Sequence, residues 1–170
     1  SDLWVFGYAS LIWRPDFDVA EQRIARVHGW HRALKMWSRI NRGTVACPGL
    51  VFALLSGGSC HGAVLKVQRQ HVETTLHRLW DREMAMGVYD PKWLQCGTQE
   101  GAVRALAFTL SRRSPSFTGE LTAERYREIF ASSCGKYGST LEYADQTWRC
   151  LQKHGIQDPA LKRLLAHAQG

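Results

Sequence analysis

Short apolar runs separated by polar turns occupy the first part of the chain, and this spacing predicts strands. Leu3–Tyr8 is an apolar, aromatic run typical of a buried strand, and a loop is expected at Pro15 and Asp16. Residues 23–38 alternate loosely between large apolar and polar side chains, which predicts a long or bent strand broken near Gly29. Further strands are predicted over residues 50–55, 62–67 and 103–110, with a hairpin connection at Ser56-Gly57-Gly58-Ser59 between the first two.

Helical periodicity is concentrated in one segment in the middle of the chain and in the last third. Residues 70–86 form the most regular of these patterns. Thr122 is the expected N-cap of a second helix, because its hydroxyl can accept a hydrogen bond from the first turn. A third helix is predicted over Leu141–His154 with its stop at Gly155, and a short last helix follows Pro159.

The order of these elements predicts the fold class. Strands dominate the first two-thirds of the chain and helices the end, which favours an α+β protein with a mixed or barrel-like sheet over an alternating βαβ fold. The chain contains no internal repeat and no linker rich in Pro or Gly. We therefore expect a single domain over residues 1–170.

Composition and charge narrow the classes of protein that remain. Hydrophobic residues make up 45% and charged residues 22% of the 170 residues, which is typical of a globular protein and excludes disorder. No run approaches the roughly 20 apolar residues of a membrane span, and the start lacks the pattern of a signal peptide. The five cysteines are widely spaced without a CxxC pair, which predicts reduced thiols in the cytoplasm and neither disulfides nor a zinc site.

The net charge of +7 suits a small anionic substrate, or it serves solubility alone. Because the basic residues are scattered, we expect no nucleic-acid partner. The pair His28 and His31 is expected on opposite faces of a strand, which argues against a metal site there. Ser10 lacks the GxSxG elbow of a hydrolase, and no glycine-rich phosphate loop occurs.

The helix predicted over residues 70–86 carries the most informative residue. At about 100° per residue, Glu83 falls near the middle of the apolar face, while Arg82 points away. That apolar face is formed by Val72, Leu76, Leu79 and Trp80. A carboxylate there is costly unless it is protonated, paired or used in chemistry. Two interpretations remain: Glu83 is paired or turned outward, or desolvation raises its pKa and makes it a general base.

The end of the first predicted strand is the second candidate region. The segment Phe6–Leu11 contains a turn of small residues, and such a turn can present consecutive backbone N–H groups to an anion or to a developing oxyanion. Small residues are common at strand ends, so this pattern alone predicts no particular ligand.

The two candidate regions belong to a series of short sequence motifs along the chain. Residues 4–13 read WVFGYASLIW, and residues 79–84 read LWDREM. Between and after them come GWHR at 29–32, NRGT at 41–44, PG at 48–49, GVY at 87–89 and LEY at 141–143. The series resembles the ChaC-like γ-glutamylcyclotransferases, whose first signature is usually WVFGYGSLIW. The resemblance covers nearly the whole chain in the expected order.

The resemblance implies an activity, a fold and a site. Such proteins cleave glutathione to 5-oxo-L-proline and cysteinylglycine in the cytoplasm, without metal or organic cofactor, on a small mixed β-barrel with flanking helices. The family's catalytic glutamate matches Glu83, and a tyrosine of its pocket matches Tyr143. Its γ-glutamyl-binding loop matches Gly7–Leu11. Arg42 is a candidate partner for the substrate's carboxylates. The predicted substrate-binding residues are Val5, Phe6, Gly7, Tyr8, Ala9, Ser10, Leu11, Arg42 and Tyr143.

Two positions depart from the family pattern and keep alternatives open. Ala9 stands where the family has Gly, which matters if that position needs a positive φ. Ser139 stands near a position where the family often has Asn. The alternatives are a cyclotransferase for other γ-glutamyl amides or amines, and a non-catalytic module that binds small anions or nucleic acid. The sequence does not predict an oligomeric state.

Overall fold

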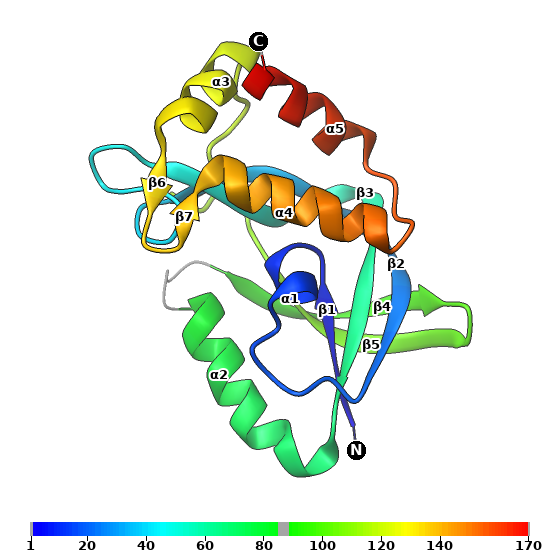
Figure 1. Cartoon of the computed structure of the whole chain (residues 1–170). Helices are drawn as coiled ribbons and strands as arrows, with labels where there is room; N and C mark the ends of the chain where they lie inside the picture. The colour runs from blue at the N-terminus through cyan, green and yellow to red at the C-terminus, as the bar shows by residue number, and fades with distance from the viewer. Residues whose placement is uncertain (1, 85–88, 170) are drawn as a thin grey trace. The chain divides into compact units, whose positions relative to one another are not determined.

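Within residues 2–84 and 89–169, which the computed structural model describes, five strands close into a barrel (Figure 1). Around the barrel they follow the order β1 (Leu3–Gly7), β3 (Gly49–Val67), β2 (Glu21–Ser38), β4 (Asp90–Thr98) and β5 (Gly101–Thr109). β1 pairs antiparallel with β3 and parallel with β5, so the sheet is mixed. The predicted α+β class with a small mixed barrel and flanking helices is confirmed.

The chain divides into two compact units. The first unit contains the chain up to Arg32 together with Leu54–Ser111, and the second contains Ala33–Ala53 together with the chain from Arg112 onward. β2 and β3 contribute residues to both units. The expectation of a single domain over residues 1–170 stays a prediction.

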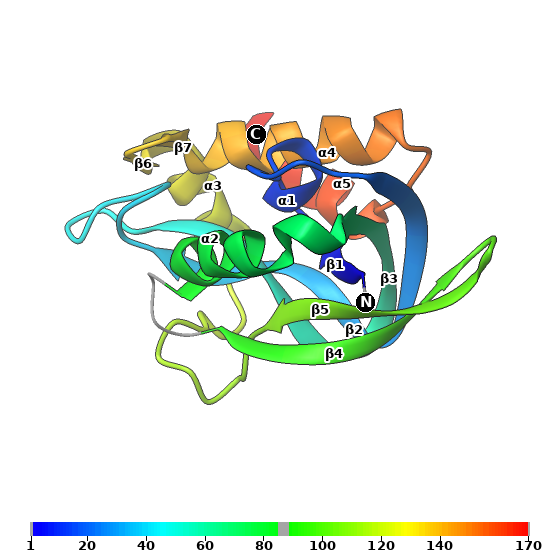
Figure 2. The ribbon, with the colours of Figure 1, turned by 90° about the horizontal axis from the view of Figure 1, so that it is seen from below.

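β1 pairs with a neighbouring strand along each of its edges. Val5 is opposite Leu65 of β3 and next to Leu106 of β5. Val5 and Phe6 are 0% exposed, which agrees with the continuous apolar run that predicted a buried strand. β4 and β5 are joined as a long antiparallel hairpin, visible along its length in Figure 2.

The predicted hairpin at residues 56–59 is wrong, because β3 runs through it as one strand. Gly57 and Gly58 have φ of +102° and +66°, so this glycine pair bends a strand instead of reversing it. His31 of β2 donates from Nδ1 to the Gly57 carbonyl oxygen over 2.8 Å, which fastens the bend to the neighbouring strand. Gly29, where a break in β2 was expected, has φ of +85° within a continuous strand.

The predicted helices are present with shifted ends. α2 covers Val72–Met84 after a short 3₁₀ turn, and the predicted end at Ala85 and Met86 lies outside the described residues, as do Gly87 and Val88. The other helices are α3 (Ala123–Ser132), α4 (Thr140–Lys153) and α5 (Pro159–Ala166). Three features were not predicted: α1 (Ser10–Trp13), β4 and the small β6–β7 pair (Cys134–Gly135 and Gly138–Ser139). No helix among the described residues is both long enough and apolar enough to cross a bilayer.

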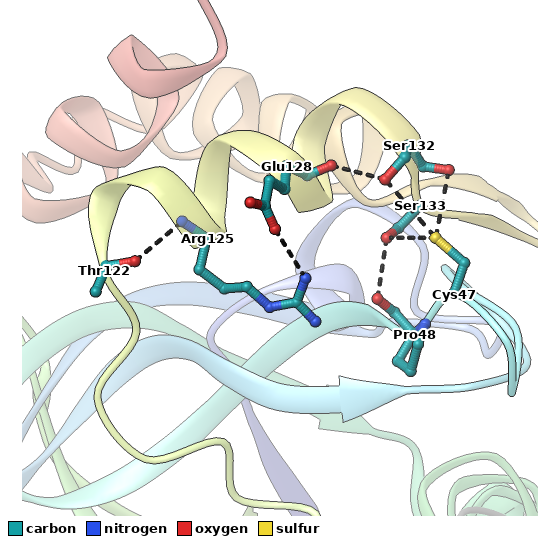
Figure 3. A network of polar contacts seen from close by, with 7 residues as sticks. All are labelled: Cys47, Pro48, Thr122, Arg125, Glu128, Ser132 and Ser133. Atoms are coloured by element: carbon teal, nitrogen blue, oxygen red, sulfur yellow. Dashed lines mark hydrogen bonds and ion pairs between the residues drawn. The ribbon is translucent and has the colours of Figure 1, made fainter.

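In the second unit, α3 is fixed at both ends by polar contacts (Figure 3). The Thr122 hydroxyl accepts the Arg125 N–H over 3.1 Å, so the predicted N-cap is confirmed. At the other end, the Ser133 hydroxyl donates to the Pro48 carbonyl oxygen over 2.9 Å, and Cys47 Sγ lies 3.5 Å from Ser133 Oγ. These contacts hold the loop before β3 against the end of α3.

The glycines of the NRGT and PG segments are explained by close backbone packing in this unit. A Cβ atom on Gly43 would collide with the Gly49 nitrogen, and one on Gly49 would collide with the Arg42 carbonyl oxygen. The hydroxyl of Thr140 donates to the same Arg42 carbonyl and accepts the Leu50 N–H. These two segments therefore serve the fold of the second unit.

Candidate active site

Glu83 lies in the last turn of α2, and its side chain is 14% exposed. The periodicity thus placed this carboxyl on the buried side of the helix correctly. Leu79, one turn earlier, is 1% exposed, whereas Trp80 is 49% exposed. The predicted apolar face is therefore correct at Leu79 and wrong at Trp80.

Burial changes the acid–base properties of Glu83. Loss of solvation raises the pKa of the Glu83 carboxyl, because the charged form loses more than the neutral form on leaving water. The positive charges of Arg82 and Arg14 oppose this effect without cancelling it. A carboxylate with a raised pKa is a stronger base, which is the property a proton acceptor near neutral pH requires.

Arg82 does not point away from the site, so that prediction is wrong. Its Nη2 donates to Ser10 Oγ over 3.0 Å, and its Nη1 donates to Asp16 Oδ2 over 2.7 Å and to the Arg14 carbonyl oxygen. Its Nε lies 3.6 Å from Glu83 Oε1. An arginine has the length to reach from the flank of a helix to a neighbouring segment, which a projection of Cα positions does not represent. Arg82 therefore ties the end of α2 to α1, and Figure 2 shows these two helices near each other.

The loop predicted to bind the γ-glutamyl group connects β1 to α1. It consists of Tyr8 and Ala9, and Ser10 is the first residue of α1. The first N–H groups of a helix have no acceptor within the helix, so those of Ser10 and Leu11 can serve an anion. Ala9 has φ of −151°, so this position does not need the left-handed conformation that only glycine adopts freely.

Side-chain contacts hold this loop in place. Tyr8 donates from its hydroxyl to the Phe108 carbonyl oxygen over 2.9 Å, and its own carbonyl accepts Arg32 Nη1 over 3.0 Å. Ala9 and Leu11 are each 5% exposed. Val5 and Phe6 are 0% exposed in the barrel, and their substrate-binding roles stay predictions.

Arg42 and Tyr143 belong to the second unit, whereas Glu83 and the β1–α1 loop belong to the first. Arg42 is 6% exposed, donates from Nη1 to the Tyr137 carbonyl oxygen over 2.8 Å, and has its guanidinium carbon 5.3 Å from the centre of the Tyr143 ring. Tyr143 accepts the Phe52 N–H at its hydroxyl over 2.9 Å. Both side chains thus have structural contacts, and their substrate-binding roles stay predictions.

Sequence reasoning missed three residues of this region: Arg14, Arg32 and the inward-facing Arg82. Arg82 is next to Glu83 in the LWDREM segment, which was the available signal for it. Arg32 lies in the GWHR segment, but no role was assigned to it, and Arg14 had no signal of its own, because the contacts of both join segments distant in sequence. In residues 2–84 and 89–169, no three His, Cys, Asp or Glu side chains are grouped closely enough to hold a metal ion.

Comparison with known families identifies the family of the chain. The family model described as ChaC-like protein matches residues 3–169. This chain belongs to the ChaC-like family. The expected family assignment is therefore confirmed.

Two relatives of this ChaC-like chain are named glutathione-specific enzymes. It is 34% identical over 164 residues to the glutathione-specific γ-glutamylcyclotransferase of Escherichia coli, covering 96% of this chain and 71% of that protein. It is 33% identical over 146 residues to human glutathione-specific γ-glutamylcyclotransferase 1, covering 83% of this chain and 66% of that protein. The chain thus spans about two-thirds to seven-tenths of the length of these relatives.

A solved structure confirms the fold. The crystal structure of a yeast γ-glutamyl cyclotransferase specific to glutathione matches with a TM-score of 0.90 and 21% identity, and the match covers 99% of this chain and 96% of that one. At this identity the likeness supports the barrel fold alone.

Proposed function

We propose that this chain is a glutathione-specific γ-glutamylcyclotransferase that releases 5-oxo-L-proline and cysteinylglycine from glutathione in the cytoplasm. The names of its relatives supply the substrate, and family membership supplies the reaction class. The observation that carries the proposal is the buried carboxyl of Glu83, with a raised pKa, beside an arginine that holds the β1–α1 loop.

The chemistry needs few groups from the protein. A γ-glutamyl compound carries its own nucleophile, the α-amine, which forms a five-membered ring when it attacks the γ-carbonyl carbon. By holding the substrate with its α-amine next to the γ-carbonyl carbon, the protein raises the rate through proximity, and this effect is large for well-oriented intramolecular reactions. What remains is to remove a proton from the ammonium group and to stabilise the oxyanion of the tetrahedral intermediate.

Glu83 performs the proton transfers in this proposal. Its carboxylate takes a proton from the α-ammonium group, and the free amine then attacks the γ-carbon to form the new C–N bond. When the intermediate collapses, the γ-carbon separates from the nitrogen of cysteinylglycine, and the proton held by Glu83 goes to that leaving amine. The ring nitrogen then gives up its second proton, through Glu83, to the same amine, so cysteinylglycine leaves as its ammonium form and Glu83 returns to its starting state. Positioned acid–base catalysis of this kind contributes about 10²–10⁴ in rate.

The β1–α1 loop provides the anion site in this proposal. Backbone N–H groups at the start of α1 face the oxyanion or the α-carboxylate, and loss of one such donor typically costs about 10²–10³ in rate. Arg82 supports this arrangement by linking the hydroxyl of Ser10 to the end of α2. Since Arg82 also lies 3.6 Å from Glu83 Oε1, one side chain positions both the base and the loop.

Mass spectrometry of the products tests the proposal. The full chain is incubated with glutathione or with γ-glutamyl-alanine, and release of 5-oxoproline is followed over time. We expect 5-oxoproline and cysteinylglycine in equal amounts from glutathione and much slower release from γ-glutamyl-alanine. Equal rates on both compounds would assign the chain to cyclotransferases of wider specificity. No 5-oxoproline from either compound would contradict the proposed activity.

A further inference from the structure

A hollow of about 660 Å³ lies on the first unit, over β2 and the tip of the β4–β5 hairpin. It is lined by residues 22–26, His28, His61 and residues 97–100. Cavities between about 300 and 1,000 Å³ are the size that small ligands occupy. Neither Glu83 nor any residue of the β1–α1 loop lines this hollow.

The hollow exists because one strand lacks a side chain at its floor. Gly97 of β4 is directly opposite Arg26 of β2. Directly opposed residues of an antiparallel pair point to the same face of the sheet, so a side chain at position 97 would fill the space beside Arg26. A Cβ atom there would meet nothing closer than the Arg26 carbonyl oxygen at 3.8 Å. The backbone therefore leaves an open site at this point.

The lining of the hollow carries positive charge. Arg26 and His28 are two positions apart on β2 and so face the same way, and His61 comes from the neighbouring β3. Among the residues that the structure describes, the side chains of Arg26, His28 and His61 make no hydrogen bond or ion pair. The carboxylate at the rim, Glu100, is already 3.0 Å from Arg23 Nε.

The electrostatic environment of His61 also indicates positive charge around the hollow. Burial lowers the pKa of His61, and the nearby charges of Arg26, Arg32 and His28 lower it further. Arg32 is buried and donates to the carbonyl oxygens of Tyr8 and His61, so its charge is held close to His61. Arg26 and Arg32 place positive charge beside His61, and such positive charge is stabilised by binding an anion.

We propose that this hollow binds a small molecule with a dianionic oxyanion group, of the phosphate monoester class. The Arg26 guanidinium pairs with the oxyanion, because its planar fork matches phosphate oxygens. The imidazoles of His28 and His61 donate to the same group. Ile24, which is 38% exposed in the lining, offers an apolar surface to the rest of the ligand.

The first test measures phosphate affinity in the full chain by calorimetry at low ionic strength, with inorganic phosphate and glycerol phosphate as probes. Arg26→Gln is expected to weaken binding of both about tenfold, since a hydrogen bond to a charged group is lost. Arg127→Gln on α3 is the matched control, because it removes the same charge from an exposed position outside the hollow. It is expected to change the affinity less than twofold. Equal losses in the two variants would overturn the proposal.

The second test fills the hollow without changing any charge. Gly97→Val is expected to weaken phosphate binding about tenfold, with Gly97→Ala as the smaller substitution if valine lowers the unfolding temperature. Titration of the His61 ring by NMR supplies a separate readout, because a bound dianion raises the pKa of this imidazole in the parent chain and not in the filled variant. Unchanged affinity in both glycine variants would overturn the proposal. The proposal would also be overturned if a duplex oligonucleotide bound more tightly than the phosphate probes and if Arg127→Gln weakened that binding as much as Arg26→Gln.

Discussion

Arg82 donates a 3.0 Å hydrogen bond from Nη2 to the hydroxyl of Ser10, which joins the last turn of α2 to the first residue of α1. The two residues are 72 positions apart in the chain. Through this bond, the helix that carries the proposed base also fixes the start of the loop proposed to bind the substrate. Base and loop can then keep a constant spacing, which proximity catalysis requires.

Arg82→Gln is expected to shift the acid limb of the pH profile of kcat/KM. The positive charge of Arg82 opposes the rise in the pKa of Glu83, so its removal raises this pKa further and moves the acid limb to higher pH. Arg82→Lys keeps the positive charge, so the midpoint of the acid limb is expected to stay at the parental pH. Both variants are expected to lower kcat, because each loses the hydrogen bond from Arg82 Nη2 to the Ser10 hydroxyl. Coincident midpoints in Arg82→Gln and the parent would contradict this electrostatic role.

Glu83→Gln is expected to stabilise the protein at neutral pH. The pKa of Glu83 is raised in the folded state, so the folded protein holds a proton that the unfolded chain releases. Stability therefore falls as pH rises from about 4.3, the unfolded value, and the loss is complete above the folded pKa. Each unit of pKa difference is worth about 1.4 kcal/mol. Denaturant unfolding at pH 7.5 and pH 4 measures this: the gain is expected at pH 7.5 and absent at pH 4. An equal gain at both values would contradict the assignment to ionisation.

Tyr143→Phe is expected to destabilise the fold. The Tyr143 hydroxyl accepts the buried Phe52 N–H, and an unsatisfied buried donor costs about 1–3 kcal/mol. The unfolding temperature is therefore expected to fall, while KM for glutathione, measured well below that temperature, changes less than twofold. A tenfold rise in KM with unchanged stability would instead support the pocket role that the family resemblance implies.

Ala9→Gly is expected to leave kcat/KM within about threefold of the parent. Because φ at Ala9 is negative, alanine is accommodated there and the methyl group does not force the loop into another conformation. Added freedom in the unfolded chain lowers the free energy of unfolding by about 0.4–1 kcal/mol. Steady-state kinetics on glutathione checks the first expectation. A rise above tenfold would show that the methyl group limits catalysis.

The burial of Glu83 could be predicted because helix periodicity is a local property. Positions 79 and 83 lie one turn apart, and a single apolar stripe identifies both. The direction of Arg82 could not be predicted in the same way. It depends on Ser10 and Asp16, which the barrel brings to the end of α2 from far along the chain.

The glycine pair in β3 shows why one hairpin was predicted wrongly. Gly57 and Gly58 both have positive φ, and this conformation serves a tight turn and a bulge equally well. The choice between them depends on whether β2 continues alongside, where His31 bonds to Gly57. β4 was missed for a related reason, because its Pro91 and Gly97 weaken the local strand pattern while β5 pairs with it along its whole length.

The most direct test of the central claim is the rate of 5-oxoproline release from glutathione by Glu83→Gln, with Glu73→Gln as the control. Glu73 is an exposed carboxylate in the first turn of the same helix. The account predicts that Glu83→Gln lowers kcat by about 10²–10⁴ with glutathione binding retained, and that Glu73→Gln has the parental rate. A Glu83→Gln variant that releases 5-oxoproline at the parental rate would contradict the account.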